Sequence, residues 1–382
     1  MDYSSVHERR PTNRTDPLAH TLVGASLSET RLKSLSPLAT PALVVAANAP
    51  DIDVVSMAVG GDFSLGFRRG WTHGVLAMII LPLAVAVVIL LADRAIAARR
   101  GRRPFRTRAA PVVALSYIGV LSHPFLDWLN TYGIRLLMPF DGRWFYGDAL
   151  FIIDPWVWLL AGSTVVLANT RSLPGQAAWV VLGIVLTVLV LGFAAVPLEA
   201  KLLWVAGLSV IVGVRVWGGA QAQLSRLALA CLIGTGLYIV AMVGGSRLAS
   251  QQVGDWLTAR GSPGTVVMAG PLAATPSVRD VIVVDSAHYH FLELDWLRAD
   301  SIRIAAPAIN RGPTGPIVEA ALTAPHLQGV LSWIRFPAYT VEPRPSGYRV
   351  TVRDVRYTRL GAVGLGTAVV DLDRELRVRS RE

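Results

Sequence analysis

The stretch Gly74–Ala92, GVLAMIILPLAVAVVILLA, decides the fold class of this chain. It carries no charged residue and comes close to the ~20 apolar residues that a helix needs to cross a bilayer. Of the whole chain, 53% of residues are hydrophobic and only 16% are charged, whereas soluble globular proteins carry about 25% charged residues. We therefore expect an integral membrane protein.

Further apolar stretches surround this one. Two short stretches, His20–Leu27 and Leu38–Ala49, precede it and predict either a helical hairpin or two re-entrant half-helices covered by protein. Longer stretches follow it at Ala109–Leu129, Leu150–Ala168, Ala177–Pro197, Leu202–Trp217 and Leu227–Gly244. Together they predict an α-helical polytopic domain with about six to eight membrane segments.

Arginine placement predicts the orientation of these segments. The loop after the first strong span holds Arg94, Arg99, Arg100, Arg102, Arg103, Arg106 and Arg108. Such a loop is expected on the cytoplasmic side. Arg171, Arg215 and Arg226 then also fall in inner loops, but Arg9, Arg10 and Arg14 would lie outside if the early stretches form a hairpin. The chain is thus expected to be a multi-pass protein of the bacterial cytoplasmic (inner) membrane.

Composition divides the chain into three regions. Residues 1–17 are polar and basic, which predicts a disordered tail without a secretory signal. Residues 18–245 form the expected membrane domain. From residue 246 to 382, short β-branched runs alternate with Gly and Pro, which predicts a small β-rich extracytoplasmic domain. Its expected strands are Asp280–Val284, His288–Leu294, Ser301–Ile304, Tyr348–Val352 and Thr367–Leu372.

Histidines and aspartates interrupt the first apolar segments, where a charged side chain costs at least ~2.5 kcal/mol. His123 and Asp127 are four residues apart, so on a helix they share one face. The orientation above places these groups at the outer ends of their segments. The residues expected to bind metal are His20, Asp51, Asp53, His73, His123 and Asp127.

The chemistry of this set favours a divalent cation. Imidazoles and carboxylates without a thiolate suit zinc, as one ion or a pair, with manganese as the alternative. Cys231, the only cysteine, lies in an apolar run and cannot form a disulfide framework. Metal chemistry at such a site predicts hydrolysis of a phosphate ester. Asp53 or Asp127 would act as the catalytic base, and Arg69 and Arg135 would bind the substrate phosphate.

Simpler explanations compete with metal binding. His20 could be a helix cap or interface residue, and Asp51 with Asp53 could cap the next helix. His123 and Asp127 could form a hydrogen-bonded pair inside the membrane. Other acids and histidines, in particular Asp148, Asp154, His288 and His290, are expected to be structural, the two aspartates because acids favour helix N-termini.

These motifs resemble the YdjM-like family of inner-membrane, LexA-binding putative metal-dependent hydrolases. The matching pieces are AHTLVGASLSE, NAPDID, RRGWTHG, SHPFLDWLNTYGIRLLMPF and FYGDALFIIDPW, which lie between about residues 16 and 158. LSWIRFPAY and YRVTVRDVRYTR are similar to an extracytoplasmic appendage of some family members. The resemblance implies a metal site at the six residues above, and the order of the ligands is also similar to that of zinc-dependent phospholipase C.

Two other functions compete with a hydrolase that acts on membrane lipid or another phosphoester at the outer face. The first is a non-enzymatic scaffold that recruits a cytoplasmic partner such as a LexA-type repressor through the basic loop. The second is a transporter, which is disfavoured because Glu199 is the only acid from Ala177 to Gly244, and it lies with Lys201 between two spans. Direct nucleic-acid binding is not expected, because the arginines follow the membrane loops.

Overall fold

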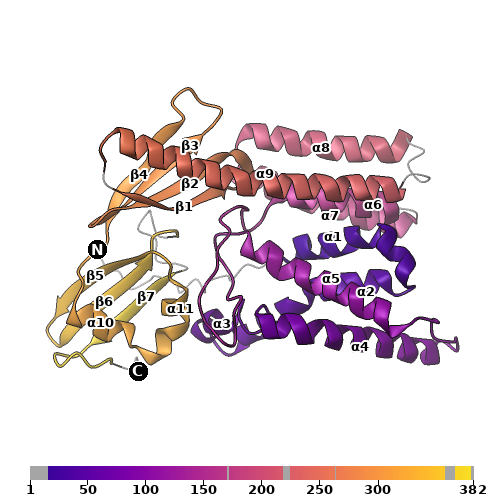
Figure 1. Cartoon of the computed structure of the whole chain (residues 1–382), viewed down its shortest axis with the longest axis horizontal. Coiled ribbons are helices and arrows are strands. Elements are labelled where there is room, and N and C mark those ends of the chain that lie inside the picture. The colour runs from indigo at the N-terminus through magenta and orange to yellow at the C-terminus, as the bar shows by residue number, and fades with distance from the viewer. Residues whose placement is uncertain (1–15, 170–171, 218–223, 263, 358–365, 380–382) are drawn as a thin grey trace.

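The computed structural model describes residues 16–169, 172–217, 224–262, 264–357 and 366–379. A helical part and a β-rich part follow one another along the chain, and they lie end to end (Figure 1). The expected tail at residues 1–17 falls almost wholly outside the described residues, as do Arg9, Arg10 and Arg14.

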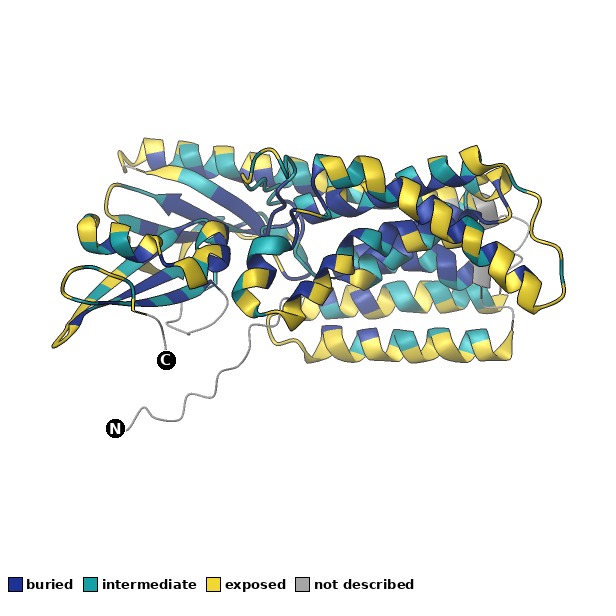
Figure 2. Ribbon diagram, turned by 90° about the horizontal axis from the view of Figure 1, so that it is seen from below, coloured by how far each residue is buried: buried dark blue, intermediate teal, exposed yellow. Residues whose placement is uncertain are grey.

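Five helices of the helical part are long and apolar enough to cross a membrane. They are α4 (Val75–Arg99), α5 (Ala109–Trp128), α7 (Leu173–Gly192), α8 (Leu198–Trp217) and α9 (Leu224–Ala259). The apolar helix α6 (Pro155–Asn169) is shorter than the stretch expected there, because Asp154 and Pro155 set its start. Figure 2 shows many exposed residues on the outward faces of the long helices, as expected for surfaces that contact lipid. The helical membrane domain is thus confirmed.

The two early apolar stretches form short helices that pair as a hairpin. These are α1 (Pro17–Ser28) and α2 (Ala39–Asn48), which are joined through the 3-10 helix η1 (Arg31–Leu35). Helix α2 packs tightly because glycines face it from both neighbours. A Cβ atom on Gly24 of α1 would lie 2.8 Å from the Ala47 Cβ, and one on Gly119 of α5 would lie 2.6 Å from the Ala46 Cβ. Small residues allow this close helix approach.

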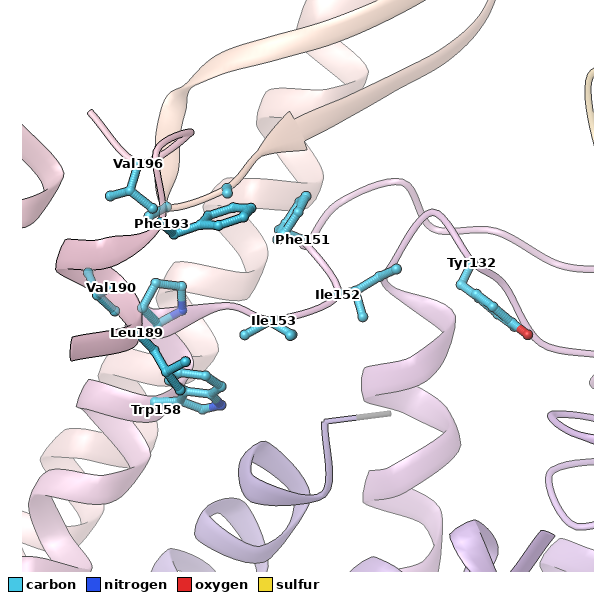
Figure 3. Close-up of a pocket in the computed structure, with 12 residues that line it drawn as sticks. Tyr132, Phe151, Ile152, Ile153, Trp158, Leu189, Val190, Phe193 and Val196 are labelled. Atoms are coloured by element: carbon cyan, nitrogen blue, oxygen red, sulfur yellow. The ribbon is translucent and has the colours of Figure 1, made fainter. Parts of the chain in front are cut away.

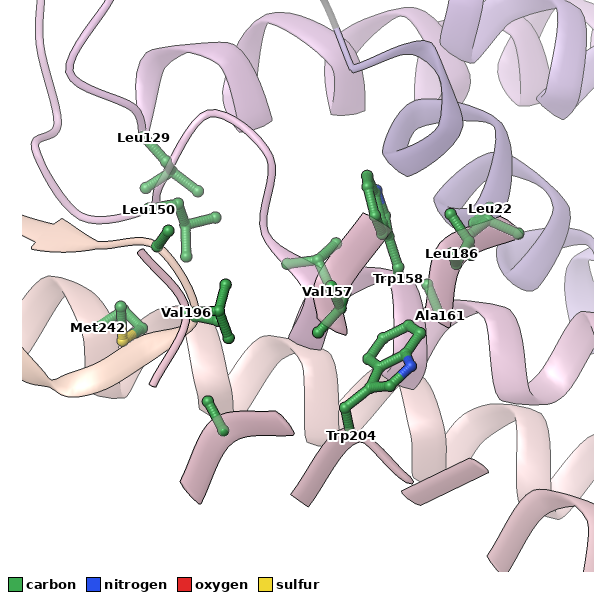
Figure 4. Close-up of a cluster of buried hydrophobic side chains, with 14 of the residues drawn as sticks. Leu22, Leu129, Leu150, Val157, Trp158, Ala161, Leu186, Val196, Trp204 and Met242 are labelled. Carbon is green, nitrogen blue, oxygen red and sulfur yellow. The ribbon is translucent and has the colours of Figure 1, made fainter. Parts of the chain in front are cut away.

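A second core holds α6 to α9 against α1. Its buried members include Leu22, Trp158, Leu186, Trp204 and Met242, which Figure 4 shows converging from separate helices. The hydroxyl of Thr187 accepts a hydrogen bond of 3.1 Å from Trp204 Nε1, so the indole nitrogen has a partner within the apolar interior. This core fixes the position of α1, and therefore of His20, relative to the later spans.

Two irregular segments close one end of the helical domain. The first contains η2 (Ala49–Ala58), α3 (Gly61–Phe67) and the turn from Arg68 to Gly74 that leads into α4. The second is the long connection between α5 and α6, which includes short bridges between Ile134 and Phe145 and between Asn130 and Leu150. The arginine-rich connection between α4 and α5 lies at the opposite end of the bundle (Figure 1).

The C-terminal part contains two antiparallel sheets, which confirms a β-rich domain. One sheet has the order β1-β2-β3-β4, formed by β1 (Thr265–Leu272), β2 (Thr275–Val284), β3 (His288–Asp295) and β4 (Ile302–Asn310). The other has the order β5-β6-β7, formed by β5 (Pro337–Arg344), β6 (Gly347–Asp354) and β7 (Thr367–Leu372). Short helices α10 (Pro316–Leu322), η4 (Pro325–Leu327) and α11 (Gln328–Trp333) connect the sheets.

Helix α9 belongs to both parts of the chain. It runs through the expected boundary at residue 246 to Ala259, and Ala249, Val253 and Leu257 pack on the first sheet. A helix of 36 residues is roughly 54 Å long, which exceeds the ~30 Å hydrocarbon core of a bilayer. The last turns of α9 therefore continue beyond the membrane as part of the β-rich domain. The location of that domain outside the cytoplasm stays a prediction.

Candidate metal centre

The six predicted ligands meet at the end of the helical domain that borders the β-rich part. His20 comes from α1, His73 from the turn before α4, and His123 with Asp127 from α5; Asp51 and Asp53 come from η2. All are buried except Asp51, whose side chain is 12% exposed. Segments far apart in the sequence thus build one polar cluster, as the sequence predicts.

Helix α5 presents one face to the cluster. Gly119, His123 and Asp127 follow one another at intervals of four residues, so they form a single row on that face. Close packing at Gly119 brings the Ala47 carbonyl of α2 to 2.6 Å from His123 Nδ1, which donates a hydrogen bond to it. In a neutral imidazole, Nε2 then carries a lone pair.

His123 Nε2 is buried and has no hydrogen-bond partner among the described residues. It lies 3.5 Å from Asp127 Oδ2 and 3.7 Å from Asp51 Oδ1. Metal-binding histidines usually donate their other N–H to a backbone carbonyl or carboxylate, which fixes the tautomer. His123 has this arrangement.

His20 stacks on His123, with ring centroids 3.6 Å apart. Its Nε2 atom lies 3.4 Å from Asp127 Oδ1, and its Nδ1 atom is buried without a hydrogen-bond partner in the part of the chain described. Asp16, the N-cap of α1, accepts hydrogen bonds from the Ala19 amide and from Trp158 Nε1. Asp16, and not His20, therefore caps the N-terminus of α1. His20 lies one turn inside the helix and faces the cluster.

A chain of hydrogen bonds orients His73. The hydroxyl of Thr72 donates to Asp53 Oδ2 over 2.9 Å and lies 2.9 Å from His73 Nδ1, from which it accepts. That tautomer leaves His73 Nε2 as an acceptor, 3.1 Å from Asp127 Oδ2. Two acceptors at this distance repel one another unless a cation or proton lies between them.

Asp53 differs from the other predicted ligands, because both of its oxygens already accept hydrogen bonds. Oδ1 accepts from Arg68 Nε, and Oδ2 accepts from the Arg69 amide as well as from Thr72. Its contacts favour a role in positioning the turn that carries His73. A direct ligand or catalytic role for Asp53 stays a prediction.

Asp51 shows the opposite pattern. Both of its carboxylate oxygens are buried, and neither has a hydrogen-bond partner among the described residues. Its nearest basic group is His123 Nε2, at 3.7 Å. Burying a carboxylate without hydrogen bonds or a counter-charge is unfavourable by roughly several kcal/mol. Such a group is therefore normally paired or bound to a metal.

Distances and charge both suit a divalent cation. Two bonds of ~2.1 Å at a tetrahedral angle place their ligand atoms roughly 3.4 Å apart, close to the separations of 3.4 to 3.7 Å found here. The ligand atoms fall into two overlapping groups: His20, His123 and Asp127, and Asp51, His73 and His123. Arg68 pairs with Asp53 and Arg69 with Asp127, which leaves Asp51 as the carboxylate without a guanidinium.

The two arginines predicted to bind substrate are buried. Arg69 Nη2 lies 2.9 Å from Asp127 Oδ1, and Nη1 donates to Asn130 Oδ1 over 3.2 Å. Arg135 instead donates to the backbone carbonyls of Gly66 and Arg68, so it braces the turn before α4. Arg69 therefore lies at the cluster and Arg135 behind it, and substrate binding by either stays a prediction.

A small cavity of about 30 Å³ adjoins the cluster beside His20 and Asp127. Such a volume has room for about one or two water molecules. Asp16 and Asp154 also line it, and both precede the helices that they cap. Burial raises the pKa of Asp16 to about 7 and that of Asp154 to about 6.

The other polar residues have structural contacts. Asp154 caps α6 and accepts a hydrogen bond from the Tyr238 hydroxyl. Asp148 does not cap a helix but forms a bidentate ion pair with Arg335 of the β-rich part. His288 and His290 both face Asp285, with His290 Nε2 at 2.6 Å from its Oδ2.

Sequence reasoning missed several residues that support the site. Thr72 orients His73, Arg68 neutralises Asp53, and Asn130 accepts from Arg69 and from the Tyr132 amide. Asp16 caps α1. The signals were the Asp–Pro pair that opens α1 and the polar residues within the strings RRGWTH and LNTYG, where only arginine and histidine were assigned a role.

Fold and site define a polytopic membrane protein with a buried His/Asp cluster at one end of its helical domain. The family model described as YdjM inner membrane protein matches residues 16–200, so over this region the chain is similar to that family. The match confirms the YdjM-like resemblance and includes every residue of the cluster. The searches of curated proteins and of solved structures gave no match.

Proposed function

We propose that this inner-membrane protein is a metal-dependent hydrolase of phosphate esters, with its site at the outer boundary of the membrane. The observation that carries the proposal is a set of buried ligand atoms that lack a hydrogen-bond partner among the residues that the structure describes: His123 Nε2 and both oxygens of Asp51. A polar network that served only the fold would satisfy these groups internally, because each unsatisfied buried group costs about 1–3 kcal/mol.

The residues that would hold the cation are His20, Asp51, His73, His123 and Asp127. Zinc suits this mixed nitrogen and oxygen set, with manganese as the alternative. A bound ion would supply Lewis-acid chemistry, which acidifies a water molecule and offsets negative charge on a phosphoryl oxygen. Two overlapping ligand groups are compatible with one ion or with two.

The chain itself would orient and neutralise the reacting groups. Asp53 and Thr72 hold the His73 tautomer, and Arg69 forms an ion pair with Asp127. Neither oxygen of Asp51 accepts a hydrogen bond from the described residues, as a ligand or a base requires, so Asp51 is better placed for proton transfer than Asp53. With two guanidinium groups against three carboxylates, addition of a divalent ion makes the cluster net positive, which favours an anionic substrate.

Location supports a substrate at the membrane surface. The cluster lies where α4 begins and α5 ends, while the arginine-rich connection lies at the other end of these helices. If that connection is cytoplasmic, as its arginines predict, the cluster faces the outer boundary, where lipid phosphates lie.

The test is hydrolysis by detergent-purified full-length protein, with p-nitrophenyl phosphate and phosphatidylglycerol as probes. We expect product only with zinc or manganese, no product after chelation, and loss of activity in His123→Ala. His290→Ala, which changes the partly exposed pair with Asp285 far from the cluster in sequence, is the matched control and should retain activity. Activity that survives chelation or the His123 substitution would contradict the proposal.

The scaffold alternative makes a separate prediction. A LexA-type partner would bind the basic connection, in which Arg102 is already held by Asp93 while Arg99, Arg100 and Arg103 are exposed. Replacing those exposed arginines would abolish partner recruitment and leave the metal content unchanged. Recruitment lost in His123→Ala instead would argue against this separation of roles.

A further inference from the structure

An apolar pocket of about 280 Å³ lies beside the candidate metal centre. Figure 3 shows the end of α7 on one side of it, with Leu189 and Val190, and the segment with Phe151 to Ile153 on another. Ala273 and Ala274, at the turn between β1 and β2, complete the wall. The pocket thus belongs to both the helical and the β-rich parts.

One end of this pocket faces the surface expected to contact lipid. Leu189 and Phe193 are about half exposed, at 55% and 49%. They lie at the end of the candidate span α7, near the hydrocarbon boundary of the outer side if the predicted orientation holds. An aqueous ligand has little to gain here, since the lining is almost wholly apolar.

The other end of the pocket reaches the polar cluster. Phe151 and Ile152 line both this pocket and the small cavity that contains His20 and Asp127. Tyr132 also lines the pocket, and its ring lies 4.7 Å from the guanidinium carbon of Arg69, which pairs with Asp127. The apolar pocket and the cavity beside the cluster are therefore neighbours that share Phe151 and Ile152 as part of their walls.

We infer that this pocket binds one hydrocarbon chain of a membrane lipid whose anionic headgroup faces the His/Asp cluster. A molecule that lies in this pocket and reaches toward the cluster must be amphiphilic, with a chain among Phe151, Leu189 and Phe193 and its polar group at the end of the pocket that borders the small cavity beside Asp127. The volume is near the lower end of the roughly 300–1,000 Å³ range of ligand pockets, which suits part of one chain rather than a whole lipid. The inference rests on the proposed function for its substrate class and deepens it from phosphate esters to lipid phosphates.

The experiment is photocrosslinking of the full chain in detergent with phosphatidylglycerol that carries a diazirine on one acyl chain. Peptide mapping should place the label on residues 151–153 and 189–196. Unlabelled phosphatidylglycerol should compete, whereas glycerol phosphate, which has the headgroup chemistry without a chain, should not. Labelling should occur in both chelated and zinc-loaded protein.

Matched variants on α7 test the assignment. Leu189→Trp fills the pocket mouth and should reduce labelling about tenfold, which corresponds to about 1.4 kcal/mol. Leu191→Trp adds the same ring on the same helix at an exposed residue that does not line the pocket, and should leave labelling unchanged. Phe193→Ser removes an exposed part of the wall and gives a second variant that disturbs folding little.

Equal labelling in Leu189→Trp and Leu191→Trp, or label spread along the lipid-facing α4, would overturn the inference. Pocket labelling without hydrolysis in either metal state would mean that the hydrolase proposal fails while the chain site stands. Metal-dependent hydrolysis together with labelling that is unchanged in the pocket variants would mean that the chain site fails while the hydrolase proposal stands.

Discussion

The Nε2 atom of His123 lies 3.7 Å from Asp51 Oδ1, and neither atom has a hydrogen-bond partner within the described part of the chain. The distance is too long for a hydrogen bond, but it suits two ligands of a shared cation. Because both atoms are buried, the pair should control how strongly metal binding is linked to folding.

Asp51→Asn is predicted to separate stability from metal binding. In chelated protein it should unfold at the same temperature as wild type or higher, because it removes an unpaired buried charge. When the metal concentration is 100 times the dissociation constant, the free energy of unfolding of the wild type should rise by about 2.7 kcal/mol. That of the variant should rise little. Thermal unfolding with and without zinc measures both effects, and an equal zinc-dependent gain in the two proteins would exclude Asp51 as a ligand.

Thr72→Val is predicted to weaken metal binding without unfolding the protein. The substitution keeps the side-chain shape but removes the hydroxyl between Asp53 and His73. Loss of such a supporting contact typically costs about 10–100-fold in metal affinity. Zinc titration with a competing chelator measures the change, with Thr258→Val on the exposed end of α9 as the control. Unchanged affinity would mean that His73 is not held by this contact.

Gly119→Val should disrupt the site through helix packing. A Cβ there would lie 2.9 Å from the Leu43 carbonyl oxygen and 2.6 Å from the Ala46 Cβ, so α2 and α5 must move apart. Such overpacking costs about 1–3 kcal/mol, and it should also displace the Ala47 carbonyl from His123. Gly183→Val, in open space on α7, is the control for thermal unfolding. Equal stability and metal content in both variants would contradict the close packing of α2.

The contact between Arg335 and Asp148 should anchor the β-rich part to the membrane domain. Both side chains are less than a fifth exposed, and the guanidinium also lies 4.0 Å from the ring centroid of Tyr146. Arg335→Ala should lower the free energy of unfolding by about 1.5–3 kcal/mol, as expected for hydrogen bonds to a charged group. Arg303→Ala breaks a more exposed pair with Glu293 and should cost about 0–1 kcal/mol. Similar costs in thermal unfolding would mean that this contact does not hold the two parts together.

Much of the fold could be predicted because long apolar stretches have few alternatives in a membrane. The long spans and the early hairpin were predicted in this way, as were five of the seven strands. Strands β1 and β5 were missed, because Gly270, Pro271 and Pro337 interrupt the β-branched pattern that signals a strand. The shortening of α6 was missed because Phe151 to Ile153 are apolar but non-helical.

The candidate site was predictable in its residues but not in their division of labour. Spacing shows that His123 and Asp127 share a helix face, and motif order suggests that Asp51, Asp53 and His73 come near them. The sequence does not show that Arg68 and Thr72 donate hydrogen bonds to Asp53, whereas Asp51 accepts none from the described residues. Those contacts depend on packing between segments that are distant in sequence.

Metal content of the purified full-length protein tests the central claim most directly. Inductively coupled plasma mass spectrometry should find stoichiometric zinc or manganese in wild type and in His290→Ala, and almost none in His123→Ala and Asp127→Ala. Folding of each variant can be verified by its thermal transition. No metal in folded wild-type protein, even after incubation with zinc and manganese, would contradict the account and leave the His/Asp cluster as a polar network within the membrane domain.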